Sequence, residues 1–89
     1  MRWCCICGKQ FSQRSPVLLH VSRNGGKNYM CRKCAEVFAV FSDESLSLQE
    51  TMPAVVYIAE NLDNITDLEV KKIVEDAANT AVRDRPDRP

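Results

Sequence analysis

Two runs of sequence decide the fold: Cys4-Cys5-Ile6-Cys7-Gly8-Lys9 near the start of the chain, and Tyr29-Met30-Cys31-Arg32-Lys33-Cys34-Ala35-Glu36 further along. Each run contains one Cys-x-x-Cys pair. This spacing lets two thiolates from one tight turn reach the same metal ion, and two such turns make a tetrahedral site of four sulfurs. A soft set of four thiolates selects zinc first and iron second. The sequence therefore predicts one bound Zn²⁺ ion with four ligands: Cys4, Cys7, Cys31 and Cys34.

The other candidate ligands fit this pattern less well. The chain has five cysteines, and an odd number without a signal-peptide pattern argues against the disulfide framework of a secreted domain. Cys5 lies two residues before Cys7, which is too close for the knuckle spacing, so we interpret it as a spare thiol. His20 is the alternative ligand, although four well-spaced cysteines favour an ordinary strand or loop histidine.

The residues around the two pairs predict a zinc knuckle, a β-hairpin and a helix. Residues 17–21 form a short apolar run with β-branched ends, which is typical of a strand. The Asn-Gly-Gly sequence within 23–27 indicates a hairpin turn, so 28–30 should return as a second strand. The second cysteine pair then opens a helix that includes 35–41. Together these elements describe a treble-clef finger over residues 1–41, in a small zinc-bound α+β protein.

After this head, the chain predicts a helical C-terminal part over residues 42–82. It begins with a polar, acidic linker over 42–50. Apolar residues then recur at helical spacing, which favours a helix near 52–62. A buried strand over 54–59 is the alternative, because Val-Val-Tyr-Ile is also β-prone.

A second helix is predicted from about 67 to 82. Thr66 followed by Glu69 matches the capping-box pattern, in which a hydroxyl and a carboxylate satisfy free N–H groups reciprocally. Residues 83–89 contain two prolines and no apolar residue. We therefore expect them to form a disordered tail.

Composition is that of one small folded domain. The chain has 89 residues, of which 45% are apolar and 27% are charged. No apolar run is long enough to span a bilayer, and the first residues lack the apolar region of a signal peptide. We therefore expect a cytoplasmic protein that does not bind membranes.

Charge is unevenly distributed although the net charge is zero. Residues 1–41 carry seven basic side chains and one acidic one, a charge of +6, whereas residues 42–89 carry −6. A basic head suits an anionic partner, either nucleic acid or an acidic protein surface. The alternative is that the two halves complement each other within one fold or between subunits.

Residues 4–41 resemble two families of small zinc fingers. The Cys-x-x-Cys-Gly-Lys start, the aromatic-apolar-Cys-x-x-Cys return and the apolar helix after it resemble the zinc-binding domain of the ClpX unfoldase. The spacing is also similar to that of the Gin type of anti-sigma factor. The first resemblance implies a treble-clef homodimer that binds adaptors and substrates, and the second implies a small standalone regulator. Neither resemblance covers residues 42–89.

A weaker resemblance connects the chain to HNH nucleases, which are also treble clefs. His20, Gly25-Gly26 and Asn28 ahead of the second cysteine pair resemble the skeleton of that motif. However, Leu19 stands where those nucleases have an acidic residue or a histidine, and no histidine occurs within 35–41. One remaining ligand cannot hold a catalytic metal. With no other catalytic constellation in the sequence, we expect no enzymatic activity.

The helix over 35–41 is apolar on more than one face, so a head of about 40 residues has too little core to cover it. The C-terminal part or a second subunit should therefore cover this helix. We predict a homodimer, and a compact monomer is the alternative.

We expect a regulator that acts through protein–protein interaction, as an inhibitor or adaptor of a larger bacterial or phage-encountered machine such as a sigma factor or a protease-unfoldase. The alternative is a nucleic-acid-binding zinc finger that would place Arg14 and the basic residues below on phosphates. The candidate contact residues are Arg23, Lys27, Arg32, Lys33, Val37, Val40 and Phe41.

Overall fold

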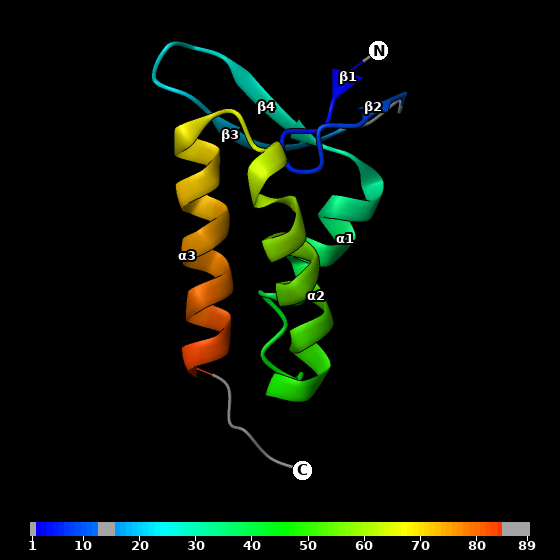
Figure 1. Cartoon of the computed structure of the whole chain (residues 1–89), viewed down its shortest axis with the longest axis vertical. Coiled ribbons are helices and arrows are strands. Elements are labelled where there is room, and N and C mark those ends of the chain that lie inside the picture. The colour runs from blue at the N-terminus through cyan, green and yellow to red at the C-terminus, as the bar shows by residue number, and fades with distance from the viewer. Residues whose placement is uncertain (1, 13–15, 85–89) are drawn as a thin grey trace.

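The computed structural model describes residues 2–12 and 16–84. Two β-hairpins form one end of the molecule, and three helices extend from it (Figure 1). The strands are β1 (Arg2–Trp3), β2 (Gln10–Phe11), β3 (Val17–Val21) and β4 (Lys27–Met30). The helices are α1 (Arg32–Val40), α2 (Leu48–Asn61), the short 3-10 helix η1 (Leu62–Asn64) and α3 (Leu68–Asp84). The chain is therefore a small α+β protein, elongated to 42 × 25 × 20 Å.

Both hairpins are antiparallel, and each has a glycine where its turn needs one. The β3–β4 hairpin matches the predicted one, with Val17 opposite Met30 and Val21 opposite Lys27. Gly25 closes its turn at φ +87°, a conformation that glycine adopts without strain. The β1–β2 hairpin, in which Trp3 lies opposite Gln10, was not predicted, because two-residue strands carry no sequence periodicity.

Helix α2 starts earlier than the sequence predicted. The expected linker over 42–50 ends in a capping box, in which the Ser47 hydroxyl accepts from the Glu50 N–H and the Glu50 carboxylate accepts from the Ser47 N–H. The helix therefore begins at Leu48 and contains Pro53 in its second turn rather than its first. The strand alternative for 54–59 is wrong, since this segment is helical.

Helix α3 is capped by a different residue from the one predicted. Asp67 Oδ1 accepts from the N–H groups of Glu69 and Val70, at 2.8 and 3.2 Å. Asp67 therefore holds the cap position expected for Thr66, and the Glu69 carboxylate turns away towards the β3–β4 hairpin. The helix continues through Arg83 and Asp84, the first two residues of the expected tail, and 85–89 lie outside the described residues.

One hydrophobic core joins the cysteine end of the molecule to all three helices. Helix α2 packs against both α1 and α3, so that it lies between them (Figure 1). The C-terminal part thus covers the apolar face of α1. This is one of the two alternatives that the sequence left open, the other being cover by a second subunit. Among the described helices, none is long and apolar enough to cross a membrane. The fully buried side chains of this core are Ile6, Cys34, Thr51, Ile58, Val70 and Val74.

Candidate metal centre

The four predicted ligands converge on one point. The Sγ atoms of Cys4, Cys7, Cys31 and Cys34 all lie within 4.8 Å of one another. A tetrahedral ion with Zn–S bonds of about 2.3 Å requires sulfurs about 3.8 Å apart. The Cys7 and Cys31 Sγ atoms are 3.9 Å apart, and all five cysteines of the chain are free thiols. The cluster therefore fits one four-coordinate metal ion.

The first pair is shaped by a tight turn between β1 and β2. The Cys4 N–H donates to the Lys9 carbonyl at 2.9 Å, and the Gly8 N–H donates to the Cys4 carbonyl at 3.0 Å. Gly8 has φ +76°, which a side chain would strain. The Ile6 N–H points at Cys4 Sγ, at 3.4 Å. A backbone donor aimed at this sulfur stabilises its thiolate form.

The second pair sits at the start of α1. Strand β4 ends at Met30, Cys31 follows as the residue that precedes the helix, and Cys34 lies in the first turn. Free N–H groups and the helix dipole favour negative charge at this end. Cys34 is fully buried and Cys4 is nearly so, whereas Cys7 and Cys31 are half-buried. The metal would thus be enclosed on one side and reachable on the other.

Electrostatics within the cluster favour a cation. A hydrogen bond from Cys34 lowers the pKa of Cys4 to about 4, while the same contact and burial raise the pKa of Cys34. Burial also raises the pKa of Cys7. The protein alone thus holds one thiolate easily and resists further negative charge. A divalent ion bound here would displace the remaining thiol protons and neutralise the added charge.

Tyr57 is a contact of the cluster that the sequence analysis missed. Its hydroxyl lies 3.1 Å from Cys34 Sγ, across 23 residues of sequence. Burial and the neighbouring Cys34 raise the pKa of Tyr57, so the phenol keeps its proton. The Lys33 ammonium lies 5.7 Å from the centre of the tyrosine ring. No local pattern indicated this contact, because it depends on how α2 packs on α1.

Cys5 and His20 lie outside the four-cysteine cluster. Burial raises the pKa of the Cys5 thiol to about 12, so it stays neutral, and its N–H donates to the Tyr29 carbonyl at 2.9 Å. His20 lies on β3, where its Nε2 is 3.1 Å from Glu69 Oε1. Cys5 is therefore a packed thiol, and His20 joins the hairpin to α3.

The basic candidate contact residues are exposed, but they do not form one patch. Arg23 and Lys27 flank the tip of the β3–β4 hairpin. Arg32 lies on α1, 3.4 Å from Glu36 Oε1, and the neighbouring Lys33 turns towards Tyr57. Arg14 falls outside the described residues.

The apolar candidate contact residues on and just after α1 are less exposed than a partner-binding role predicts. Val37 is 8% exposed and belongs to the core, so it offers a partner little surface. The reason is that α2 lies over this face of α1. Val40 and Phe41 are half-buried, and the Phe41 ring meets the edge of Phe38 at a centroid distance of 5.9 Å.

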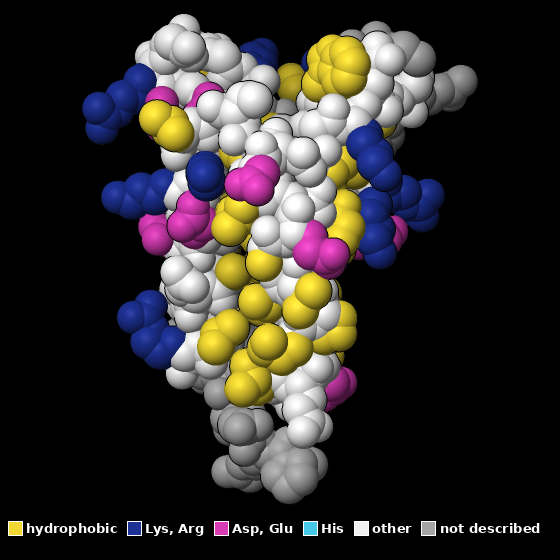
Figure 2. All heavy atoms as spheres, in the orientation of Figure 1, with side chains coloured by type: hydrophobic (Ala, Val, Ile, Leu, Met, Phe, Trp, Pro, Cys, Tyr) yellow, Lys and Arg dark blue, Asp and Glu magenta, His cyan; other side chains and the backbone are white. Residues whose placement is uncertain are grey.

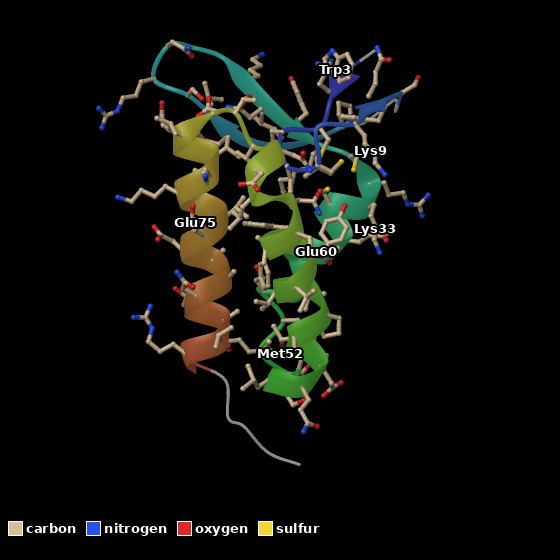
Figure 3. The ribbon with its side chains drawn as sticks, in the orientation of Figure 1. Trp3, Lys9, Lys33, Met52, Glu60 and Glu75 are labelled. Carbon is tan, nitrogen blue, oxygen red and sulfur yellow. The ribbon has the colours of Figure 1, made fainter. Side chains whose placement is uncertain are left out.

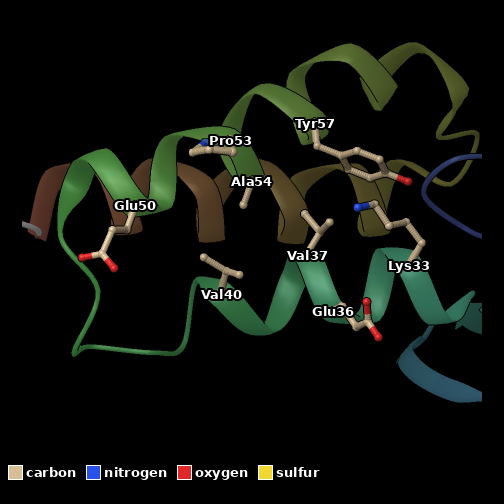
Figure 4. Close-up of a pocket in the computed structure, with 8 residues that line it drawn as sticks. All are labelled: Lys33, Glu36, Val37, Val40, Glu50, Pro53, Ala54 and Tyr57. Atoms are coloured by element: carbon tan, nitrogen blue, oxygen red, sulfur yellow. The ribbon is translucent and has the colours of Figure 1, made fainter.

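A groove of about 300 Å³ remains open between α1 and α2 (Figure 4). Apolar side chains form its floor, and Glu36, Glu50 and Lys33 stand around it. Three of the predicted contact residues, Lys33, Val37 and Val40, thus line one depression. The apolar residues that line it are Val37, Val40, Pro53, Ala54 and Tyr57.

Other exposed apolar side chains were not singled out by the sequence. Trp3 is 65% exposed at the hairpin end, where it projects from the surface (Figure 3). Apolar side chains also gather over the lower part of α2 and along its boundary with α3 (Figure 2). Met52 and Val56 are 39% and 50% exposed there. An isolated strand residue and the outer face of a helix give no sequence pattern that separates exposure from burial.

The fold and the cysteine cluster define a small α+β protein with four cysteines placed so that they could hold a metal ion. Comparison with known proteins adds no narrower class: no family model, curated protein or solved structure matches the chain.

Proposed function

We propose that the chain is a zinc protein whose first part, residues 1–41, is a treble-clef finger. The observation that carries this proposal is the convergence of four cysteine sulfurs within 4.8 Å. Four thiolates without an open position suit a structural ion rather than a catalytic one. A knuckle between β1 and β2, the β3–β4 hairpin and a helix that starts at the second cysteine pair support the treble-clef assignment.

Metal analysis of protein purified without added metal tests the zinc assignment. We expect one zinc ion per chain, and loss of the folded hairpin end when a chelator removes it. A Cys31→Ser/Cys34→Ser variant should lose the metal, whereas Cys5→Ser should keep it. A fully folded protein with no bound metal would refute the proposal. One iron ion per chain would keep the site but show that its metal is iron rather than zinc.

We further propose that the protein acts by binding another protein in the α1–α2 groove and has no enzymatic activity. The groove has an apolar floor, and two carboxylates, Glu36 and Glu50, stand on its rim. Lys33 is directed at the Tyr57 ring. This chemistry fits a segment that presents an apolar side chain beside a lysine or arginine. A sigma factor or a protease-unfoldase remains the candidate partner, and reduced thiols suit a cytoplasmic location.

A charge reversal on the groove tests the interaction. Wild-type protein and a Glu36→Lys variant would be used as bait in nuclease-treated bacterial lysate, with Glu60→Lys on the outer surface of α2 as the matched control. We expect one stoichiometric protein partner that Glu36→Lys loses and Glu60→Lys retains. If all three baits recover the same amount of the partner, the partner binds outside the groove or binds non-specifically.

Nucleic-acid binding is the second candidate, and the exposed Trp3 favours it. An aromatic ring 65% exposed on a basic head can stack on a base, as in single-strand binding proteins. The −6 charge of the remaining chain opposes a polyanion. Retention of single-stranded DNA at near-physiological salt, lost in Trp3→Ala and in Arg23→Glu/Lys27→Glu, would favour this function over protein binding.

We also propose a homodimer. Met52 and Val56 form an exposed ridge on α2, and beside it an apolar groove of about 140 Å³ runs between α2 and α3. A ridge and a groove on the same face can fit a second copy of that face across a two-fold axis.

A further inference from the structure

Tyr57 connects the C-terminal part of the molecule to the metal centre. Its hydroxyl is 3.1 Å from Cys34 Sγ, although the residue belongs to α2 and the sulfur to α1. Cys34 is fully buried, so water does not compete for this sulfur. Around the contact, α1 and α2 share the core residues Val37, Ala54 and Ile58.

A bound metal would change this contact. With the proposed zinc ion bound, Cys34 would be a thiolate, and its sulfur could then only accept a hydrogen bond. A hydrogen bond to an ionised acceptor is roughly twice as strong as a neutral one. The Lys33 ammonium lies 5.7 Å from the centre of the Tyr57 ring, at the same end of the groove (Figure 4).

We propose that Tyr57 is a positioning residue of the metal centre, whose phenol donates to Cys34 Sγ and thereby makes the docking of α2 on α1 depend on the metal. The inference rests on the proposed metal site. It also concerns the proposed partner groove, since Tyr57 and Lys33 line the end of that groove closest to the cysteines (Figure 4). Metal loading would then order a surface that lies outside the finger itself.

Cobalt titration tests the hydrogen bond. Cobalt bound to four thiolates absorbs through sulfur-to-metal charge transfer, whose energy reports the electron density on the sulfurs. Tyr57→Phe removes only the hydroxyl, and we expect about tenfold weaker metal affinity, the lower end of the effect of outer-shell partners. The charge-transfer band should move to lower energy, because an unbonded thiolate gives up its electron more easily. Tyr29→Phe changes the chain's other tyrosine and should leave affinity and spectrum unchanged.

Hydrogen exchange tests the consequence for α2. In the wild type, adding zinc should slow amide exchange over Leu48–Asn61, and in Tyr57→Phe this slowing should be smaller at full metal occupancy. A wild-type chain that binds no cobalt would refute the metal site itself. Normal binding with the same affinity, spectrum and α2 protection in Tyr57→Phe would refute the role of Tyr57 alone.

Discussion

Single side chains connect the parts of this molecule, and Asp67 shows how. One carboxylate oxygen caps α3, and the other accepts from the Ser22 hydroxyl at 2.5 Å. Ser22 is 4% exposed and also accepts from Asn28 Nδ2 at 2.8 Å. The Ser22 hydroxyl lowers the pKa of Asp67, and His20 lowers the pKa of Glu69. Because both pKa values are lowered on folding, these contacts stabilise the fold at neutral pH. The stabilisation declines once the pH falls below the usual values of 3.8 and 4.5, and it is lost as the pH falls through the lowered values of the folded protein.

Replacing Asp67 should therefore cost more than the loss of a helix cap. Asp67→Ala removes the cap, worth about 1 kcal/mol, and leaves the buried Ser22 hydroxyl without its acceptor, which costs about 1 kcal/mol more. We expect the free energy of unfolding of zinc-loaded protein in urea to fall by about 2 kcal/mol. Thr66→Ala, which removes the cap expected from sequence, should change it by less than about 0.5 kcal/mol. Equal losses in the two variants would show that Thr66 shares the cap.

At the scale of secondary structure, local patterns predicted what local interactions determine. The Cys-x-x-Cys pairs, the Asn-Gly-Gly turn and the apolar spacing of α3 all act within a few residues, and the corresponding elements are confirmed. The start of α2 was wrong by four residues, because the capping box at Ser47 and Glu50 lay inside a segment whose polarity suggested a linker. The Tyr57–Cys34 contact could not be predicted from the sequence, because it depends on how α2 packs against α1.

The cap of α2 gives a prediction at this scale. Ser47→Ala removes the side-chain acceptor of the Glu50 N–H, and we expect a loss of about 1 kcal/mol in the free energy of unfolding. Ser42→Ala, in the exposed segment before the helix, should be close to neutral. Urea unfolding followed by circular dichroism compares the two. A neutral Ser47→Ala variant would mean that α2 starts where the sequence first placed it, near residue 52.

At the scale of the whole molecule, the two halves depend on each other. The helix that follows the cysteines is covered by α2, and Glu69 of α3 binds the β3–β4 hairpin through His20 and the Arg23 N–H. Glu69 thus joins the two halves of the chain at this contact. The fold also leaves apolar side chains uncovered on α2 beside α3 (Figure 2). Met52, Val56 and Ala59 of α2 are exposed. An apolar surface that the chain itself does not bury is the part of the molecule best suited to a second copy.

A charge placed on this face should separate the two copies. Val56→Glu puts a carboxylate on the ridge, where a two-fold interface would remove it from water at a cost of several kcal/mol. We expect wild-type protein at high concentration to have about twice the chain mass of 10.1 kDa by light scattering, and Val56→Glu to have the monomer mass. Leu68→Glu is the control, because Leu68 is 80% exposed at the start of α3 and does not line the α2–α3 groove. Equal zinc content and helicity in all three proteins would show that the variants are folded. A monomeric wild type at several hundred micromolar, or a Val56→Glu variant that stays dimeric, would contradict the interface, since each result requires the α2–α3 face to remain open to solvent.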